Sequence, residues 1–384
     1  MTHAATDSPT TKAADAVVSV RDLEVQFETP IGLVRALNGV TFDVPRGQVL
    51  GIVGESGCGK SVTARAIMQI IEKSGKIVNG TIELNRPDTA TSEDAVASQI
   101  LADEDADAET ARAIKAGRVE ITSLKPNSAG MRAIRGKEIA MIFQEPMSSL
   151  NPVYTVGSQI EEAILLHQTQ DKKEAARRAV DMLRQVGMPN PEGAAQAYPH
   201  QLSGGMRQRA MIAMALSCTP TLLIADEPTT ALDVTTEAQI LELMRKLKED
   251  IGMSIMFITH SMGVVAQLCD EVIVMYLGQV VERASVDEIF YHPKHPYTQS
   301  LLRSIPRIGS DRKVPLEVIK GSVPDPYARV PGCPFHPRCP EFMAGRCDTK
   351  VPVEISMDDD PTHTVRCHLY YDDDQVPATT ASEA

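Results

Sequence analysis

Short hydrophobic runs separated by turn residues dominate the first part of the chain. Hydrophobic and polar residues alternate over 17–20, 23–27 and 40–44, as they do in strands that bury one face. Pro30 and Gly32 interrupt the pattern before the third run and are typical of a turn. The pattern therefore predicts that the chain begins with antiparallel β-structure.

Continuous apolar runs further along the chain alternate with segments that repeat apolar residues every three or four positions. The first kind is typical of strands buried on both faces of a sheet, and the second of amphipathic helices. Strands are expected over 49–53, 80–84, 139–143, 221–225 and 254–259, and a hairpin over 272–283. Helices are expected over 61–71, 156–168, 172–186, 201–217 and 235–249. This alternation predicts an α/β fold with a mostly parallel sheet, an antiparallel β subdomain and a helical subdomain.

The chain also divides into regions of different character. A polar lead has no apolar core, an acidic stretch interrupts the β-rich part, and the last part is proline-rich and irregular. The expected regions are a disordered lead (1–16), an α/β domain (17–285) with an acidic insertion (86–117) and a helical subdomain (150–217), a C-terminal region (286–370) and a disordered tail (371–384).

Composition narrows the possible classes of protein. The 384 residues carry a net charge of −13, which argues against a nucleic-acid partner, because a nucleic-acid surface needs clustered Lys and Arg. No run approaches the roughly 18–20 apolar residues that a membrane span requires, and the first residues lack the apolar core of a secretion signal. We therefore expect a cytoplasmic protein, in which the seven cysteines are thiols or metal ligands.

The strongest chemical motif is Gly54–Ser61, which has the Gly-x4-Gly-Lys-Ser pattern of a phosphate-binding loop between a strand and a helix. An ordinary glycine-rich turn is the alternative, and the Lys-Ser pair and both flanking elements argue against it. Lys60 is expected to reach the β- and γ-phosphates of a nucleoside triphosphate and Ser61 to bind Mg²⁺. The residues expected to contact the nucleotide are Gly54, Glu55, Ser56, Gly57, Cys58, Gly59, Lys60, Ser61 and Val62.

Two carboxylates, Asp226 and Glu227, follow the apolar run 221–225. Parallel sheets bind ligands at the edge where the carboxyl ends of their strands meet. Asp226 is therefore expected to hold Mg²⁺ opposite Ser61, and Glu227 is placed to activate an attacking water. An acidic cap on the next helix is the alternative, and the upstream phosphate loop favours the catalytic interpretation.

A second anion-binding pattern lies at Leu202–Gln208. Ser203 can cap the following helix, and Gly204 and Gly205 allow close backbone approach to a ligand. Taken alone, the segment is a capped helix. One triphosphate does not need two helix N-termini from one chain, so this pattern is expected to bind a nucleotide held by another subunit.

These motifs resemble those of the ABC-transporter ATPase family, in the same order and spacing over residues 17–285. Leu202–Gln208 resembles the family signature, and Gln144 and His260 resemble the Q-loop glutamine and the switch histidine. Asp233 lies in the segment that resembles the D-loop. The resemblance implies a P-loop ATPase core and a head-to-tail dimer in which each ATP lies between two subunits.

The same resemblance implies a role for each residue of the site. Glu227 would be the general base, His260 would contact the γ-phosphate, and Gln144 would meet Mg²⁺ and the attacking water. Ser203-Gly204-Gly205 of one subunit would contact the ATP bound to the other. Phe27 or Ile31 would meet the adenine, and the sequence leaves the choice between them open.

The C-terminal region resembles that of the oligopeptide/dipeptide permease branch of the family, which includes nickel importers. The resemblance lies in the segments 291–298, 321–326 and 332–340. It implies an ATP-hydrolysing subunit of a peptide importer on the cytoplasmic face of the cell membrane. Its implied partners are a second ATPase subunit, which is a paralogue, two transmembrane permease subunits and an extracytoplasmic peptide-binding protein. The alternatives are nickel or another small solute as cargo, or a non-transport ABC ATPase.

Four cysteines, Cys333, Cys339, Cys347 and Cys367, gather in this C-terminal region. Their spacing lacks the short C-x2-C pairs of zinc ribbons and the dense run of bacterial ferredoxins. Metal binding and four plain thiols therefore both remain open from the spacing. The resemblance to the permease branch implies a [4Fe–4S] cluster, with zinc as the second choice.

Overall fold

The computed structural model describes residues 16–86, 95–101, 117–144, 149–230, 232–305, 319–357 and 359–372. The expected lead and tail lie outside these ranges except for residues 16, 371 and 372, and most of the expected acidic insertion does too. Within the described ranges, no helix is both long and apolar enough to cross a membrane.

An antiparallel sheet forms the β subdomain that the alternating pattern predicts. Its strands are β1 (Ala16–Thr29), β2 (Gly32–Pro45), β4 (Gly75–Asn85) and β5 (Arg118–Glu120), in the order β2-β1-β4-β5. The runs 17–20 and 23–27, expected as separate strands, are one strand with a bulge between them, where Asp22 has a φ of 47°. A bulge adds one residue without ending the strand, so the break in the alternation was misleading.

The larger sheet contains the parallel strands and carries the core. Its order is β11-β12-β10-β9-β3-β8-β7-β6, in which β9, β3, β8, β7 and β6 run parallel to one another. These strands are β3 (Val49–Val53), β6 (Ile139–Ile142), β7 (Leu222–Asp226), β8 (Ser254–Thr259), β9 (Glu271–Tyr276), β10 (Gln279–Ser285), β11 (Ile355–Met357) and β12 (Asp360–Val365).

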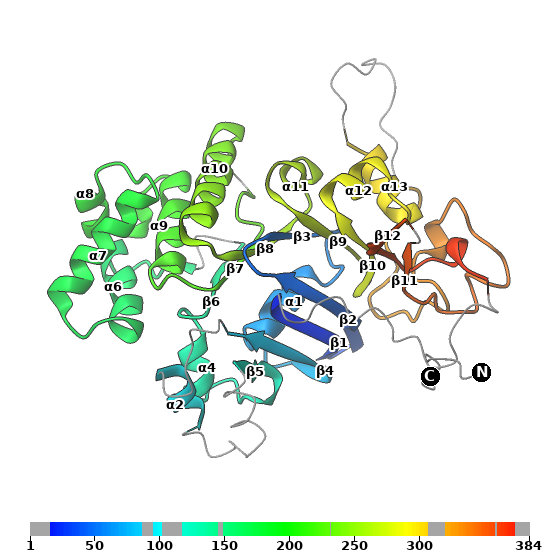
Figure 1. Ribbon diagram of the computed structural model, residues 1–384, viewed down its shortest axis with the longest axis horizontal. Helices are drawn as coiled ribbons and strands as arrows, with labels where there is room; N and C mark the ends of the chain where they lie inside the picture. Colours follow the sequence, from blue (N-terminus) through cyan, green and yellow to red (C-terminus); the bar gives the residue numbers. More distant parts are fainter. Residues whose placement is uncertain are drawn as a thin grey trace, which may run out of the picture.

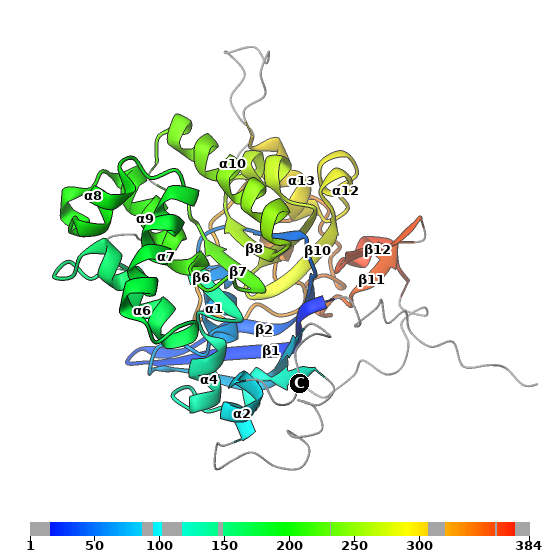
Figure 2. The ribbon, with the colours of Figure 1, turned by 60° about the vertical axis from the view of Figure 1, so that its left-hand side comes forward.

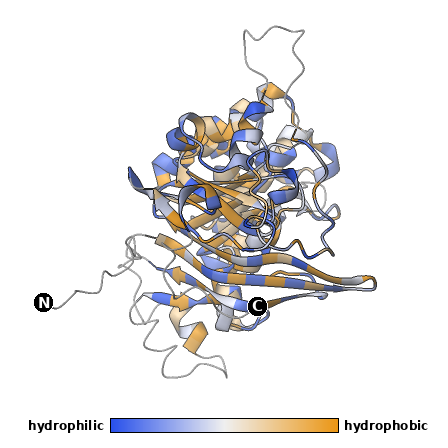
Figure 3. Cartoon of the chain, turned by 90° about the vertical axis from the view of Figure 1, so that its right-hand side faces the viewer, coloured by the Kyte–Doolittle hydropathy of each residue, from blue (hydrophilic) through white to orange (hydrophobic). Residues whose placement is uncertain are grey.

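Both faces of this sheet are buried. Along β8, Ile255 and Phe257 belong to one hydrophobic cluster and Met256 and Ile258 to another. Successive side chains of a strand point to opposite faces, which explains why a strand covered on both sides reads as one apolar run. Figure 3 shows the hydrophobic residues concentrated in the central strands.

Most helices cover one face of the larger sheet or extend beyond its β6 edge, whereas the helix Lys60–Ile67 and the antiparallel sheet pack against the other face (Figure 1). Figures 1 and 2 show α6 to α9 grouped at one end of the molecule and β11 and β12 at the other. The helices are α1 (Lys60–Ile67), α2 (Ala95–Leu101), α4 (Ala129–Ile134), α6 (Val156–His167), α7 (Lys172–Gln185), α8 (Pro191–Gln196), α9 (Gly204–Leu216), α10 (Val234–Ile251), α11 (Met262–Leu268), α12 (Val286–Tyr291) and α13 (Pro296–Arg303).

The C-terminal region is joined to the core sheet. Strand β12 pairs with β10, so the β11–β12 hairpin continues the sheet. Tyr297 and Phe335 are buried in the same cluster as the α6–α9 helices, and both rings contact Tyr276 of β9. The irregular character expected of this region from its prolines is therefore only partly observed.

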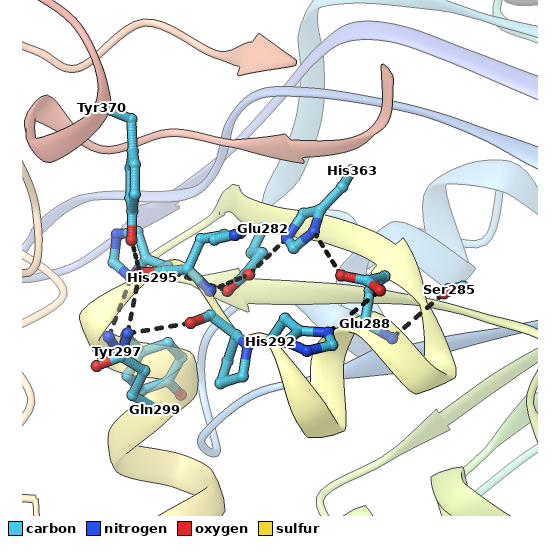
Figure 4. Close-up of polar contacts among 11 residues, drawn as sticks. Glu282, Ser285, Glu288, His292, His295, Tyr297, Gln299, His363 and Tyr370 are labelled. Carbon is cyan, nitrogen blue, oxygen red and sulfur yellow. Dashed lines mark hydrogen bonds and ion pairs between the residues drawn. The ribbon is translucent and has the colours of Figure 1, made fainter. Parts of the chain in front are cut away.

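A buried carboxylate ties three segments of this region together (Figure 4). Glu282 of β10 accepts the backbone N–H groups of Lys294 and His295 at 2.6 and 3.0 Å, and lies 2.8 Å from the His363 ring of β12. His295 is itself buried, which lowers its pKa to about 4 and keeps its ring neutral, so that Nδ1 accepts the Tyr297 N–H. Because a carboxylate this deep needs such partners, the contacts fix the C-terminal hairpin against the core.

Candidate active site

The polar residues singled out in the sequence lie at the carboxyl ends of adjacent parallel strands. Gly54 follows β3, Asp226 ends β7, His260 follows β8, and Gln144 lies two residues beyond β6. Parallel strands have their carboxyl ends at one edge of the sheet, and this is the edge where such sheets bind ligands.

The phosphate loop has the conformation that its glycines allow. Gly59 has a φ of 103°, and a Cβ there would lie 2.7 Å from the Ala36 carbonyl oxygen, so a larger residue would strain the loop. Lys60 is buried, and its Nζ donates to the carbonyl oxygens of Gly54 and Glu55 at 2.8 and 3.1 Å. The loop thus holds the Lys60 ammonium group at the N-terminus of helix α1, and a helix N-terminus itself favours a bound anion.

A cavity of about 630 Å³ opens beside this loop, a volume within the usual range for small-molecule sites. Eight of the residues expected at the site line this cavity: Ser56, Gly57, Gly59, Lys60, Ser61, Val62, Gln144 and Glu227. Phe27 and Ile31, the two candidates for adenine contact, do not line it, and Ile31 is exposed at the β1–β2 turn. The lining also includes Asp325–Pro326, Ala328–Val330, Gly332 and Pro334 of the C-terminal region.

Asp226 meets the phosphate loop directly. Its Oδ1 accepts a hydrogen bond from Ser61 Oγ at 3.0 Å, and the carboxyl is almost fully buried. Burial raises the pKa of Asp226, the Ser61 hydrogen bond acts in the opposite direction, and the neighbouring Glu227 raises it further. A buried carboxylate and a hydroxyl are hard oxygen ligands of the kind that Mg²⁺ prefers, so this pair suits the metal of a nucleotide.

Glu227 is the centre of a second set of contacts. Its carboxylate accepts from Gln144 Nε2 at 3.1 Å and Thr230 Oγ1 at 3.0 Å, and lies 3.3 Å from His260 Nδ1. Its φ of 47° is unusual for a non-glycine residue. Gln144 therefore contacts Glu227 here, and no contact joins it to the Ser61–Asp226 pair among the hydrogen bonds of the described residues.

The second expected anion site lies elsewhere in the chain. Ser203 caps helix α9 by accepting the Met206 N–H at 3.3 Å, and Asp233 caps α10 by accepting the Thr236 N–H at 3.0 Å. Ser203, Gly204, Gly205 and Asp233 do not line the cavity beside the phosphate loop. Within one chain, the structure does not bring the two helix N-termini to the same site.

Cys58, inside the phosphate loop, is 4% exposed, and burial raises its pKa. Lys60 acts against this shift without overcoming it. The thiol is therefore a packed side chain, which suits a position where the backbone carries the chemistry.

The four C-terminal cysteines all line one small cavity, together with His336 and His368. Burial raises the pKa of Cys333 and Cys339 to about 11 and that of Cys367 to about 12. Within the described residues, no group of three or more His, Cys, Asp or Glu side chains is placed to hold a metal ion. Neither zinc nor an iron–sulfur cluster, both expected from the sequence, is supported by a metal site in this part of the chain.

Two residues of the C-terminal region touch the phosphate loop, and although both lie in segments that carry the family resemblance, the sequence assigned neither a role at the site. Arg338 forms a bidentate ion pair with Glu55, and Tyr297 Oη accepts the Glu55 N–H at 2.9 Å. These contacts join positions 283 and 242 residues apart, which local motifs do not report.

Comparison with known proteins agrees with this geometry. Residues 37–230 match the family model of the ABC transporter, and residues 281–347 match that of the oligopeptide/dipeptide transporter C-terminal region. The oligopeptide transport ATP-binding protein AppD of Bacillus subtilis is 46% identical over 92% of this chain and 97% of its own length. The dipeptide transport ATP-binding protein DppD of Escherichia coli is 42% identical over 93% of this chain and 98% of its own length.

Solved structures share the fold at lower identity. The bacterial ABC transporter cassette MJ0796, solved as a dimer, has a TM-score of 0.55 and 23% identity, and covers 70% of this chain and 98% of its own. CbiO1 of Clostridium perfringens, part of the CbiONQ transporter complex, has a TM-score of 0.54 and 23% identity, and covers 72% and 92%. The chain therefore belongs to the ABC-transporter ATP-binding family, and within it to the proteins that carry the oligopeptide/dipeptide transporter C-terminal region.

Proposed function

We propose that this chain is the ATP-hydrolysing subunit that energises uptake of dipeptides or oligopeptides through an ABC importer. The observation that carries the proposal is the convergence of Lys60, Ser61, Asp226, Glu227 and His260 at one sheet edge. The peptide cargo rests on the similarity to AppD and DppD over nearly the whole chain, including the C-terminal region.

The site residues have distinct roles in this proposal. Lys60 exchanges its carbonyl partners for the β- and γ-phosphate oxygens, and Ser61 and Asp226 would hold Mg²⁺. The metal, when bound, offsets the charge of the phosphates. Glu227 accepts a proton from the attacking water, while Gln144 and His260, both in contact with Glu227, orient that water and the γ-phosphate.

The site is completed by a second ATPase chain. Ser203 and Gly204, at the N-terminus of helix α9, are exposed, and neither lines the cavity of its own chain. A helix N-terminus that faces outward is available to a nucleotide on another subunit. The dimer found for MJ0796 is in keeping with this arrangement. Asp233, at the N-terminus of α10, is proposed to lie in the same interface.

The further partners follow from the same class of importer. They are two transmembrane permease subunits, an extracytoplasmic peptide-binding protein and, as the second ATPase, a paralogue. The chain itself would dock on the cytoplasmic face of the membrane. Nickel or another small solute is the alternative cargo, because this chain would not contact the cargo in either case.

Reconstitution tests the cargo. The chain is assembled in vesicles with the proposed permease subunits, second ATPase chain and binding protein. Uptake of a labelled dipeptide that requires ATP is the expected result, with Ni²⁺ as the competing cargo. Uptake of Ni²⁺ without peptide would replace the peptide assignment, and ATP hydrolysis indifferent to the permease would point to a non-transport ATPase.

For the C-terminal cysteines we propose a [4Fe–4S] cluster. The support is that four cysteines from separated segments line one cavity, and four cysteines are the ligand set of such a cluster. A single zinc ion with Zn–S bonds of about 2.3 Å would hold sulfurs within roughly 4 Å of one another. A cluster is larger and accepts more widely spaced cysteines.

Anaerobic purification is expected to give a brown protein with about four iron atoms per chain if it carries one such cluster. Cys347→Ser is expected to lower the iron content sharply, because it removes one of four ligands. Cys269→Ser is the matched control, since Cys269 is buried in the ATPase core and does not line the cavity. Colourless protein, or iron content equal in both variants, would contradict the cluster.

A further inference from the structure

The phosphate loop of this chain carries a carboxylate, Glu55, directly beside its phosphate-binding backbone. Arg338 Nη1 and Nη2 donate to the two oxygens of Glu55 at 2.6 and 3.0 Å. The arginine side chain is 4% exposed and the glutamate side chain 26% exposed. This fork-to-carboxylate geometry is the strongest form of side-chain ion pair.

Arg338 is fixed by further contacts on the side of the C-terminal region. Its Nε donates to the Lys320 carbonyl oxygen at 3.2 Å, and Nη1 lies 3.3 Å from Tyr276 Oη. The guanidinium also lies 5.9 Å from the centre of the Tyr276 ring, within reach of a cation–π interaction. Its hydrogen bonds to Glu55 are the main reason that the pKa of Arg338 is raised, so it stays charged.

The backbone of Glu55 is held from the same side. Its N–H donates to Tyr297 Oη, and its carbonyl oxygen accepts from Lys60 Nζ at 3.1 Å. Glu55 therefore links the C-terminal region to the lysine that is to meet the phosphates. If a neutral residue replaced Arg338, the Glu55 carboxylate would have no positive partner. It would then lie beside the site proposed for the negatively charged triphosphate.

We infer that the C-terminal region prepares the phosphate loop for ATP, with Arg338 as a positioning residue that fixes Glu55 and neutralises its charge. The inference rests on the proposed ATP site. On this inference the C-terminal region raises the affinity of the chain for ATP. The Arg338–Glu55 ion pair does not contact Glu227, so we expect it to affect ATP binding more than the hydrolysis step.

The test compares Arg338→Met with the wild-type chain by nucleotide titration and by steady-state ATP hydrolysis. Arg338→Met is expected to weaken Mg-ATP binding at least tenfold, with KM raised in proportion and kcat changed less than threefold. The double variant Glu55→Gln/Arg338→Met is expected to recover affinity to within threefold of wild type, since no carboxylate then remains to repel the phosphates. Failure of the double variant to recover would overturn the charge argument.

Arg346→Met is the matched control, because Arg346 packs on Tyr371 in the same region with no contact to Glu55 in the structure. Equal losses of affinity in Arg346→Met and Arg338→Met would overturn the inference in favour of a general effect of the region's stability. If Arg338→Met does not fold, Arg338→Lys keeps the charge, loses the fork and is expected to weaken ATP binding about threefold. If Arg338→Lys bound ATP as tightly as the wild-type chain, the inference would also be overturned. If the wild-type chain did not bind ATP at all, the proposed function itself would be overturned.

Discussion

Replacing Glu227 by Gln is expected to lower ATP turnover by about 10²–10⁴-fold, the usual loss when a general base is removed. Gln is nearly the same size and keeps an acceptor for Gln144 and Thr230, but it does not take a proton at neutral pH. The contacts of Lys60, Ser61 and Asp226 do not involve the Glu227 side chain, so Mg-ATP binding is expected to change less than threefold. Phosphate release and nucleotide titration measure the two quantities separately.

Glu242→Gln provides the control for this substitution. Glu242 is an exposed residue of helix α10 that pairs with Arg245, and it does not line the cavity. We expect its turnover to equal that of the wild-type chain. A Glu227→Gln protein that hydrolyses ATP at nearly the normal rate would show that another group activates the water.

The features that could be predicted from the sequence are those that short segments determine. The continuous apolar runs of β8 and the neighbouring strands predict that both faces of the sheet are buried. The Gly-x4-Gly-Lys-Ser pattern predicts a phosphate-binding loop and the position of its lysine, Lys60. The rule that parallel strands end at one edge then brings Asp226 and Glu227 to Gly54–Ser61, although more than a hundred residues separate them in the chain.

The features that could not be predicted depend on the packing of distant segments. Nothing in the spacing of Arg338 distinguishes it from other arginines, and only the docking of the C-terminal region brings it to Glu55. Strand β12 is short and polar, with residues such as Asp360 and Thr362, because it lies near the end of the sheet and is only partly buried. The pattern of a buried strand is therefore absent from it.

The other large effect is expected for the substitution Gly204→Asp, which should reduce ATP hydrolysis by about 10²–10³-fold. A loss of this size is usual when an electrostatic contact to the reacting group is removed. A Cβ built at Gly204 meets no atom within 4 Å, so the side chain has room. A carboxylate in the first turn of α9 also interacts favourably with the helix dipole, so the chain should fold at least as stably as wild type. The loss would come from repulsion between this carboxylate and the γ-phosphate on the partner subunit.

Gly204→Ala separates charge from size, because it adds the Cβ without the carboxylate. We expect it to retain far more activity than Gly204→Asp, and both variants to bind ATP normally in the absence of a partner, since Gly204 does not line the cavity of its own chain. Thermal unfolding, nucleotide titration and phosphate release on the assembled ATPase pair measure the three properties. Hydrolysis by Gly204→Asp at the wild-type rate would show that α9 does not face the nucleotide of the partner subunit. A carboxylate beside the γ-phosphate would have to change the barrier to phosphoryl transfer.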